Sequence, residues 1–79
     1  MYISIGMELE ERISWAIGII EVRGGQATKE RLIGLAMAKG LSHTAAYDLV
    51  RILVAKELVR EITKDGIKIL ILLREAVSP

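Results

Sequence analysis

The chain has 79 residues, of which 52% are hydrophobic but only 4% aromatic, and its formal net charge at pH 7 is +1. This length predicts one domain over residues 1–79 with a modest, aliphatic core. Because there is no Cys and a single His, disulfides and Cys-based zinc sites are excluded, and we expect no metal site.

The apolar residues of the chain do not form a long uninterrupted segment. The longest such run, Ile69–Leu73, has five residues, which is far too few to span a membrane. The first residues also lack the basic start of a secretory signal. We therefore expect a cytoplasmic protein without a membrane segment.

Charge is distributed unevenly along the chain. Residues 1–22 carry four Glu and one Arg, a net charge of −3, whereas residues 23–79 carry ten Lys or Arg and six Asp or Glu, a net charge of +4. This asymmetry predicts that one face of the molecule meets phosphate groups and another does not. The chain also has no Asn and a single Gln, a composition that we expect of a thermophilic, archaeal source.

The N-terminal third is expected to form a short strand and then a helix. Residues 2–5 alternate and are β-prone, which predicts a strand that ends at Gly6. A helix is predicted over residues 7–22, with acidic residues in its first turn and an apolar stripe toward the core. Trp15, Ile19 and Val22 form a second apolar stripe on another side. The second stripe can be covered by the N-terminal strand, by the hairpin or by a partner subunit. Two apolar sides on one helix of so small a domain are typical of a dimer interface, so we expect a homodimer.

Two further helices are predicted in the middle of the chain. Residues 23–27 are expected to form a loop, after which Thr28 caps a second helix that runs to about Ala38. Gly34 lies inside this helix, where Gly costs about 1 kcal/mol against Ala, so we expect close packing of the third helix there. Gly40 fits the left-handed residue that ends a helix, and Ser42 caps the third helix.

The third helix is expected to have an apolar side and a polar side. Four aliphatic residues at helical spacing should point into the core: Ala46, Leu49, Val50 and Leu53. The opposite side carries mostly residues that can form hydrogen bonds: Thr44, Tyr47, Asp48, Arg51 and Ala55.

A β-hairpin is predicted after the third helix. Its strands are expected at residues 58–63 and 67–73, joined at Asp65-Gly66, because both positions of a two-residue turn need positive φ. This register gives the hairpin two apolar faces, one of which contains Leu70 and Leu72. We expect these two residues to join Trp15, Ile19 and Val22 in the dimer interface, and the N-terminal strand to pair with the hairpin.

The order of elements predicts an α+β winged helix-turn-helix, with three helices, a C-terminal hairpin and a short N-terminal strand. Residues 26–73 resemble the winged helix-turn-helix regulators, the broad group that includes the MarR, ArsR and PadR families. Leu41 and Ser42 match the turn of that pattern, Ala46, Leu49, Leu53 and Leu58 match its buried positions, and residues 64–68 match its wing. The resemblance implies DNA binding as a dimer, usually in transcriptional control.

In such a fold the start of the third helix reads base edges in the major groove. The residues expected there are His43, Thr44, Tyr47 and Arg51. The residues expected to hold phosphates are Thr28, Lys29 and Ser42, and Lys64 and Lys68 beside the hairpin tip are expected to reach the backbone or the minor groove.

Each of these residues also has a purely structural interpretation. Thr28 and Ser42 are helix caps in any case, and His43 and Tyr47 can be ordinary surface residues. Arg51 can simply pair with Asp48 or Glu57, and the hairpin lysines can protect a sheet edge. Trp15 is more typical of a core or an interface than of a ligand site.

Two residues depart from the regulator pattern. Asp48 lies on the side expected to face DNA, where it would repel phosphate, and Glu57 replaces the Gly expected before the wing, which predicts a helical turn there. Asp48, the low net charge and the surplus of apolar surface favour the alternative function, a winged-helix module that binds protein instead of DNA. No nucleophile–base–acid set and no phosphate loop is present, so we expect no enzyme, no cofactor and no small-molecule ligand.

Overall fold

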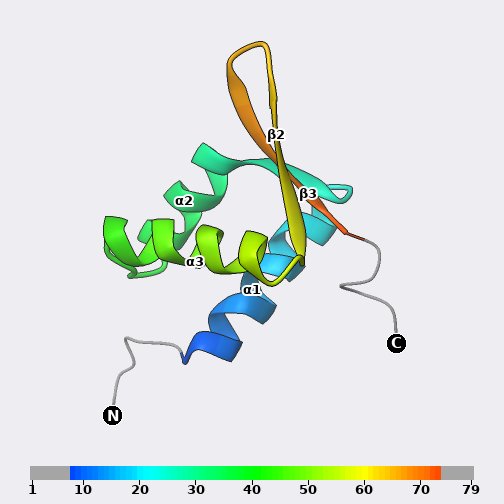
Figure 1. Ribbon diagram of the computed structural model, residues 1–79. Coiled ribbons are helices and arrows are strands. Elements are labelled where there is room, and N and C mark those ends of the chain that lie inside the picture. The colour runs from blue at the N-terminus through cyan, green and yellow to red at the C-terminus, as the bar shows by residue number, and fades with distance from the viewer. Residues whose placement is uncertain (1–7, 74–79) are drawn as a thin grey trace.

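The computed structural model describes residues 8–73 (Figure 1). The elements in chain order are α1 (Leu9–Val22), β1 (Gln26–Thr28), α2 (Lys29–Ala38), α3 (His43–Ala55), β2 (Val59–Lys64) and β3 (Ile67–Leu72). The strands form one antiparallel sheet in the order β1-β3-β2. The helices gather around the base of this sheet, and the β2–β3 hairpin projects beyond them. The strand predicted at residues 2–5 lies outside the described residues.

The strand β1, which the sheet contains in addition to the two hairpin strands, was not predicted from the sequence. It pairs with β3, with Ala27 opposite Leu70 and Thr28 opposite Ile69. The backbone N–H of Leu72 also donates to the carbonyl of Gly25 at 2.8 Å. The loop predicted over residues 23–27 is therefore wrong for residues 26 and 27, which belong to β1. Three residues are too few to show an alternating pattern, and the open edge of β3 is what makes them a strand.

The helix starts follow the capping residues. The hydroxyl of Thr28 accepts from the Arg31 N–H at 3.1 Å, and the hydroxyl of Ser42 accepts from the Ala45 N–H at 3.1 Å. Both predicted caps are confirmed. Helix α1 begins two residues later than expected, at Leu9, because Glu8 is its N-cap and donates its backbone N–H to the Glu11 carboxylate at 3.0 Å.

The C-terminal ends of α2 and α3 share one geometry but use different residues. Gly40 follows α2 with φ +117°, and Glu57 follows α3 with φ +60°. At the end of α3, the N–H of Leu58 donates to the Leu53 carbonyl and the N–H of Glu57 to the Val54 carbonyl, both at 2.9 Å. This is a Schellman motif. The prediction of a helical turn at Glu57 is wrong, because the residue adopts the left-handed conformation that a Gly would take.

The hairpin turn forms as predicted. Asp65 and Gly66 have φ of +54° and +78°, and Lys64 lies opposite Ile67. Val59 pairs with Leu72, so these two residues lie on the sheet face that also holds Leu70. That face turns toward the helices, because Val59 and Leu70 are buried.

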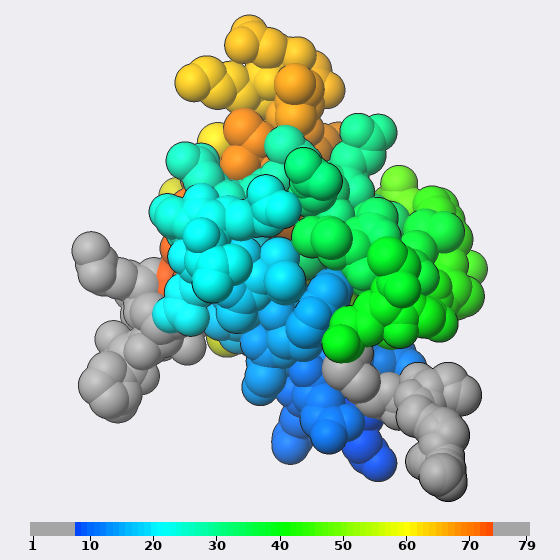
Figure 2. All heavy atoms as spheres, turned by 180° about the vertical axis from the view of Figure 1, so that it is seen from behind, coloured from blue at the N-terminus to red at the C-terminus, as the bar shows by residue number. Residues whose placement is uncertain are grey.

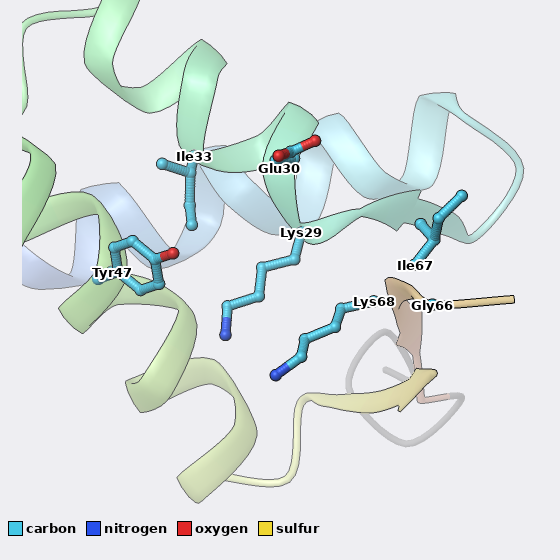
Figure 3. Close-up of a pocket in the computed structure, with 7 residues that line it drawn as sticks. All are labelled: Lys29, Glu30, Ile33, Tyr47, Gly66, Ile67 and Lys68. Carbon is cyan, nitrogen blue, oxygen red and sulfur yellow. The ribbon is translucent and has the colours of Figure 1, made fainter. Parts of the chain in front are cut away.

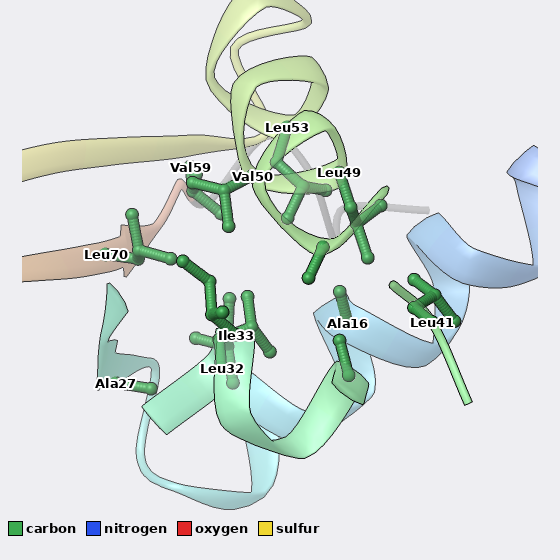
Figure 4. Close-up of a cluster of buried hydrophobic side chains, with 13 residues drawn as sticks. Ala16, Ala27, Leu32, Ile33, Leu41, Leu49, Val50, Leu53, Val59 and Leu70 are labelled. Carbon is green, nitrogen blue, oxygen red and sulfur yellow. The ribbon is translucent and has the colours of Figure 1, made fainter. Parts of the chain in front are cut away.

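The core is aliphatic and lies between the three helices and the base of the sheet (Figure 4). The predicted inner face of α3 is confirmed, since all four of its residues are buried: Ala46, Leu49, Val50 and Leu53. Two other expectations are wrong. Leu70 is 0% exposed, so it has no surface to offer a second copy. Gly34 is exposed, and a Cβ there would meet no atom within 4 Å, so α3 does not pack against it.

Candidate nucleic-acid interface

The outer side of α3 is exposed and carries no net charge. The Nη1 atom of Arg51 lies 3.6 Å from the Oδ1 atom of Asp48, one helical turn away, and their side chains are 79% and 56% exposed. Thr44 lies on the same exposed side of the helix. An exposed pair at this spacing contributes little to stability. Little free energy is therefore lost when Arg51 leaves Asp48 and binds another acceptor.

Two aromatic rings mark the N-terminal half of α3. The rings of His43 and Tyr47 meet edge to face, with centroids 4.7 Å apart and an interplanar angle of 62°. The Nζ atom of Lys29, from the first turn of α2, lies 5.2 Å from the centroid of the Tyr47 ring. This distance is within the range of a cation–π contact. Tyr47 thus connects the predicted base-reading side of α3 to a lysine predicted to bind phosphate.

A carboxylate on the hairpin joins two of the predicted lysines. The Nζ atom of Lys29 lies 3.7 Å from one carboxylate oxygen of Glu61, and the Nζ atom of Lys68 lies 3.7 Å from the other. Glu61 was not identified from the sequence. The hairpin register did contain a signal, because Lys68 pairs with Thr63 and Glu61 lies two residues before Thr63, on the same face.

These side chains surround a shallow pocket of about 250 Å³ between the start of α2, α3 and the hairpin (Figure 3). Its lining residues are Lys29, Glu30, Ile33, Tyr47, Gly66, Ile67 and Lys68. In Figure 3 the Lys29 and Lys68 side chains extend next to each other into the space beside Tyr47. The structure therefore brings together three of the residues predicted to contact DNA.

The other residues predicted to contact DNA do not line this pocket. Lys64 is exposed beside the turn, and it lies on the opposite hairpin face from Lys68 because their cross-strand pairs are adjacent. Seen from behind, the hairpin tip stands clear of the helices (Figure 2). Thr28 and Ser42 accept hydrogen bonds as caps, which leaves each hydroxyl proton available for a phosphate oxygen.

The second apolar side of α1 is only partly exposed. Val22 is 81% exposed, whereas Trp15 and Ile19 are half-buried and pack against the core, as does Leu72 at the end of β3. The Nζ atom of Lys39 lies 6.0 Å from the centroid of the Trp15 ring. Of the residues predicted for a dimer interface, Val22 offers the most open surface.

The described residues, 8–73, contain neither a metal-binding cluster nor a membrane-spanning helix. No group of three or more His, Asp or Glu in this range is arranged to hold a metal ion. None of the helices in the same range is long and apolar enough to cross a membrane.

Three helices and a three-stranded antiparallel sheet with a projecting hairpin define a winged helix-turn-helix. No protein-family model and no curated protein matches the chain. Among solved structures, the chain is similar to F93 from STIV, a winged-helix DNA-binding protein, with a TM-score of 0.68 over 89% of this chain and 77% of that one. The sequences are 20% identical. The likeness confirms the winged-helix fold, but it does not show that the chain belongs to the MarR, ArsR or PadR families.

Proposed function

We propose that the protein binds double-stranded DNA, with the start of α3 in the major groove and the hairpin on the backbone or in the minor groove. The observation that carries this proposal is the pocket that joins Lys29, Tyr47 and Lys68 between α3 and the hairpin. One duplex lying over this pocket would touch both elements. The fold shared with a winged-helix DNA-binding protein supports the same assignment.

The charges on this surface suggest a division of roles. Because Asp48 offsets Arg51, the outer side of α3 has no net attraction for phosphate. Its exposed side chains, His43, Thr44, Tyr47 and Arg51, suit base edges. Phosphate contacts then fall to the start of α2 and to the hairpin, through Lys29, Lys64, Lys68 and the hydroxyl groups of Thr28 and Ser42.

We further infer a homodimer that regulates transcription, in which residues 1–79 act as one domain without catalysis. The interface would use Trp15, Ile19 and Val22 of α1 together with Leu72, and Val22, at 81% exposed, is its strongest support. A dimer that reads two half-sites must place its two α3 helices about 34 Å apart. Sedimentation equilibrium is expected to give twice the mass of the chain, and the mass of a single chain would remove this inference.

The DNA proposal is tested by titrating mixed-sequence duplex DNA and following fluorescence anisotropy at low and moderate salt. Wild-type protein should bind, and more weakly as salt rises. A triple variant with Arg51→Ala, Lys64→Ala and Lys68→Ala should lose most of this binding. The matched control removes three positive charges elsewhere, by Arg23→Ala, Lys39→Ala and Lys56→Ala. Absence of wild-type binding at low salt, or equal binding by the first triple variant, would contradict the proposal.

A protein-binding module is the second candidate, and one observation favours it. Besides being electrically neutral, the outer side of α3 exposes apolar surface on Tyr47 and Val54, which are 40% and 37% exposed. Surfaces that combine an aromatic residue with little net charge are typical of protein interfaces. In this case DNA titration would show no binding at any salt concentration.

A further inference from the structure

Glu61 occupies the place where a DNA phosphate would meet the two pocket lysines. Each of its carboxylate oxygens faces one ammonium group, that of Lys29 or that of Lys68. A phosphate group offers the same arrangement, with anionic oxygens that can each accept from one lysine. The two anions therefore compete for the same pair of cations.

The ion pairs of Glu61 are loose enough to be exchanged. Both nitrogen–oxygen distances are 3.7 Å, well beyond the roughly 2.7–2.9 Å of a charge-assisted hydrogen bond. The Lys68 side chain is 56% exposed, so it can turn toward a ligand, whereas those of Lys29 and Glu61 are 20% and 26% exposed. Glu30 also lines the pocket, so the two lysines and the two glutamates leave a net charge of 0 there, instead of the +1 that would remain without Glu61.

From this geometry we propose that Glu61 competes with DNA phosphate for Lys29 and Lys68. This competition lowers the affinity of the protein for DNA of any sequence. Phosphate contacts supply nearly all non-specific binding, and each contributes a slope of about −0.9 to the dependence of log K on log salt. A carboxylate that cancels one such contact makes stable binding depend more on base contacts by α3. The inference rests on the proposed DNA-binding function.

A purely structural role for Glu61 makes the opposite prediction. If its main task were to tie the hairpin to α2 through Lys29, removing its charge would loosen the pocket and weaken DNA binding. If it competes with phosphate, removing its charge strengthens DNA binding, because both lysines then face the DNA backbone without their ion pair to Glu61. The sign of the change in affinity therefore separates the two roles.

The experiment compares wild-type protein with Glu61→Gln and with Glu10→Gln, using a mixed-sequence duplex over a series of salt concentrations. Glu10→Gln removes the same charge from the first turn of α1, at the end of the molecule away from the hairpin tip. We expect Glu61→Gln to bind about eightfold more tightly at ~0.1 M salt, with a slope steeper by about 0.9, and Glu10→Gln to match wild type. Adding Lys68→Ala to Glu61→Gln should remove the gain.

The possible failures can be told apart. Wild-type binding with an unchanged or weaker Glu61→Gln variant overturns the role of Glu61 and leaves the DNA-binding proposal in place. Absence of binding by all three proteins overturns both. Thermal unfolding followed by circular dichroism establishes that each variant is folded, so that a loss of affinity is not mistaken for a loss of structure.

Discussion

Helix α3 and the β2–β3 hairpin stand on two sides of one pocket, but they are held in different ways. The inner face of α3 is fixed in the core, where Leu49 and Leu53 are 2% and 0% exposed. Only the base of the hairpin reaches the core, and Ile67 beside its tip is 53% exposed. The hairpin also carries Lys64 and Lys68, whereas the Asp48–Arg51 pair leaves the outer side of α3 without net charge. In the proposed complex, α3 is therefore the rigid element that reads bases, and the β2–β3 hairpin is the cationic element that contacts the DNA backbone.

The largest expected effect tests how differently the two elements are anchored. Leu53→Ala should lower the free energy of unfolding by about 2–5 kcal/mol, because it leaves a cavity beneath α3. Ile67→Ala, the matched truncation at the hairpin tip, should change it by no more than about 0.5 kcal/mol. Chemical denaturation measures both values. Similar losses from the two variants would show that the tip is as well anchored as the helix.

The next effect tests where the phosphate contacts lie. Replacing Lys64 and Lys68 together by Ala should weaken binding to mixed duplex DNA by roughly 10- to 60-fold at ~0.1 M salt and reduce the salt slope by one to two. Replacing Asp48 by Asn and Arg51 by Gln keeps the net charge of α3 and should leave that slope unchanged. A larger change in slope from the α3 variant than from the hairpin variant would reverse the proposed division of roles.

A smaller effect concerns the junction between the two elements. Glu57→Gly should raise the free energy of unfolding by about 1 kcal/mol, because Glu57 has φ +60° and Gly adopts this conformation without the penalty of a Cβ. Glu57→Ala removes the same carboxylate but keeps the Cβ, so it should bring no such gain. If Ala stabilised the protein as much as Gly, the cause would be the charge and not the backbone.

The smallest effect concerns α2, which supports α3. Gly34→Ala should stabilise the protein by about 0.5–1 kcal/mol, because the position is helical and open. Gly40→Ala should destabilise it, since Gly40 has φ +117°. Thermal unfolding resolves the two directions. A loss of stability in Gly34→Ala would mean that α3 does need the space beside this residue.

Local signals in the sequence were enough to predict most of the fold. The caps at Thr28 and Ser42, the Asp65-Gly66 turn and the apolar face of α3 each depend on a few neighbouring residues. The strand β1 was missed because it exists only against the edge of β3. The left-handed conformation of Glu57 was missed because the residue type disfavours it and the Schellman bonds impose it.

The candidate site was predicted less completely than the fold. The sequence identified the residues Lys29, Tyr47 and Lys68, but not that they surround one pocket, because they come from three separate elements. Glu61 was missed because its role depends on a lysine of α2 as well as on its own hairpin. Leu70 was assigned to an interface because the alternation of a strand shows which residues share a face, and not which face is covered.

The most direct test of the account is a titration of the protein with duplex DNA followed by amide chemical shifts in ¹⁵N–¹H NMR spectra. We predict that the largest shifts fall on the N-cap Ser42 and residues 43–51 of α3, at the start of α2 and on residues 61–68 of the hairpin, while α1 changes little. Shifts confined to α1 or to the outer face of the sheet, or no shifts at any DNA concentration, would contradict the assignment of α3 and the hairpin as the DNA-binding surface.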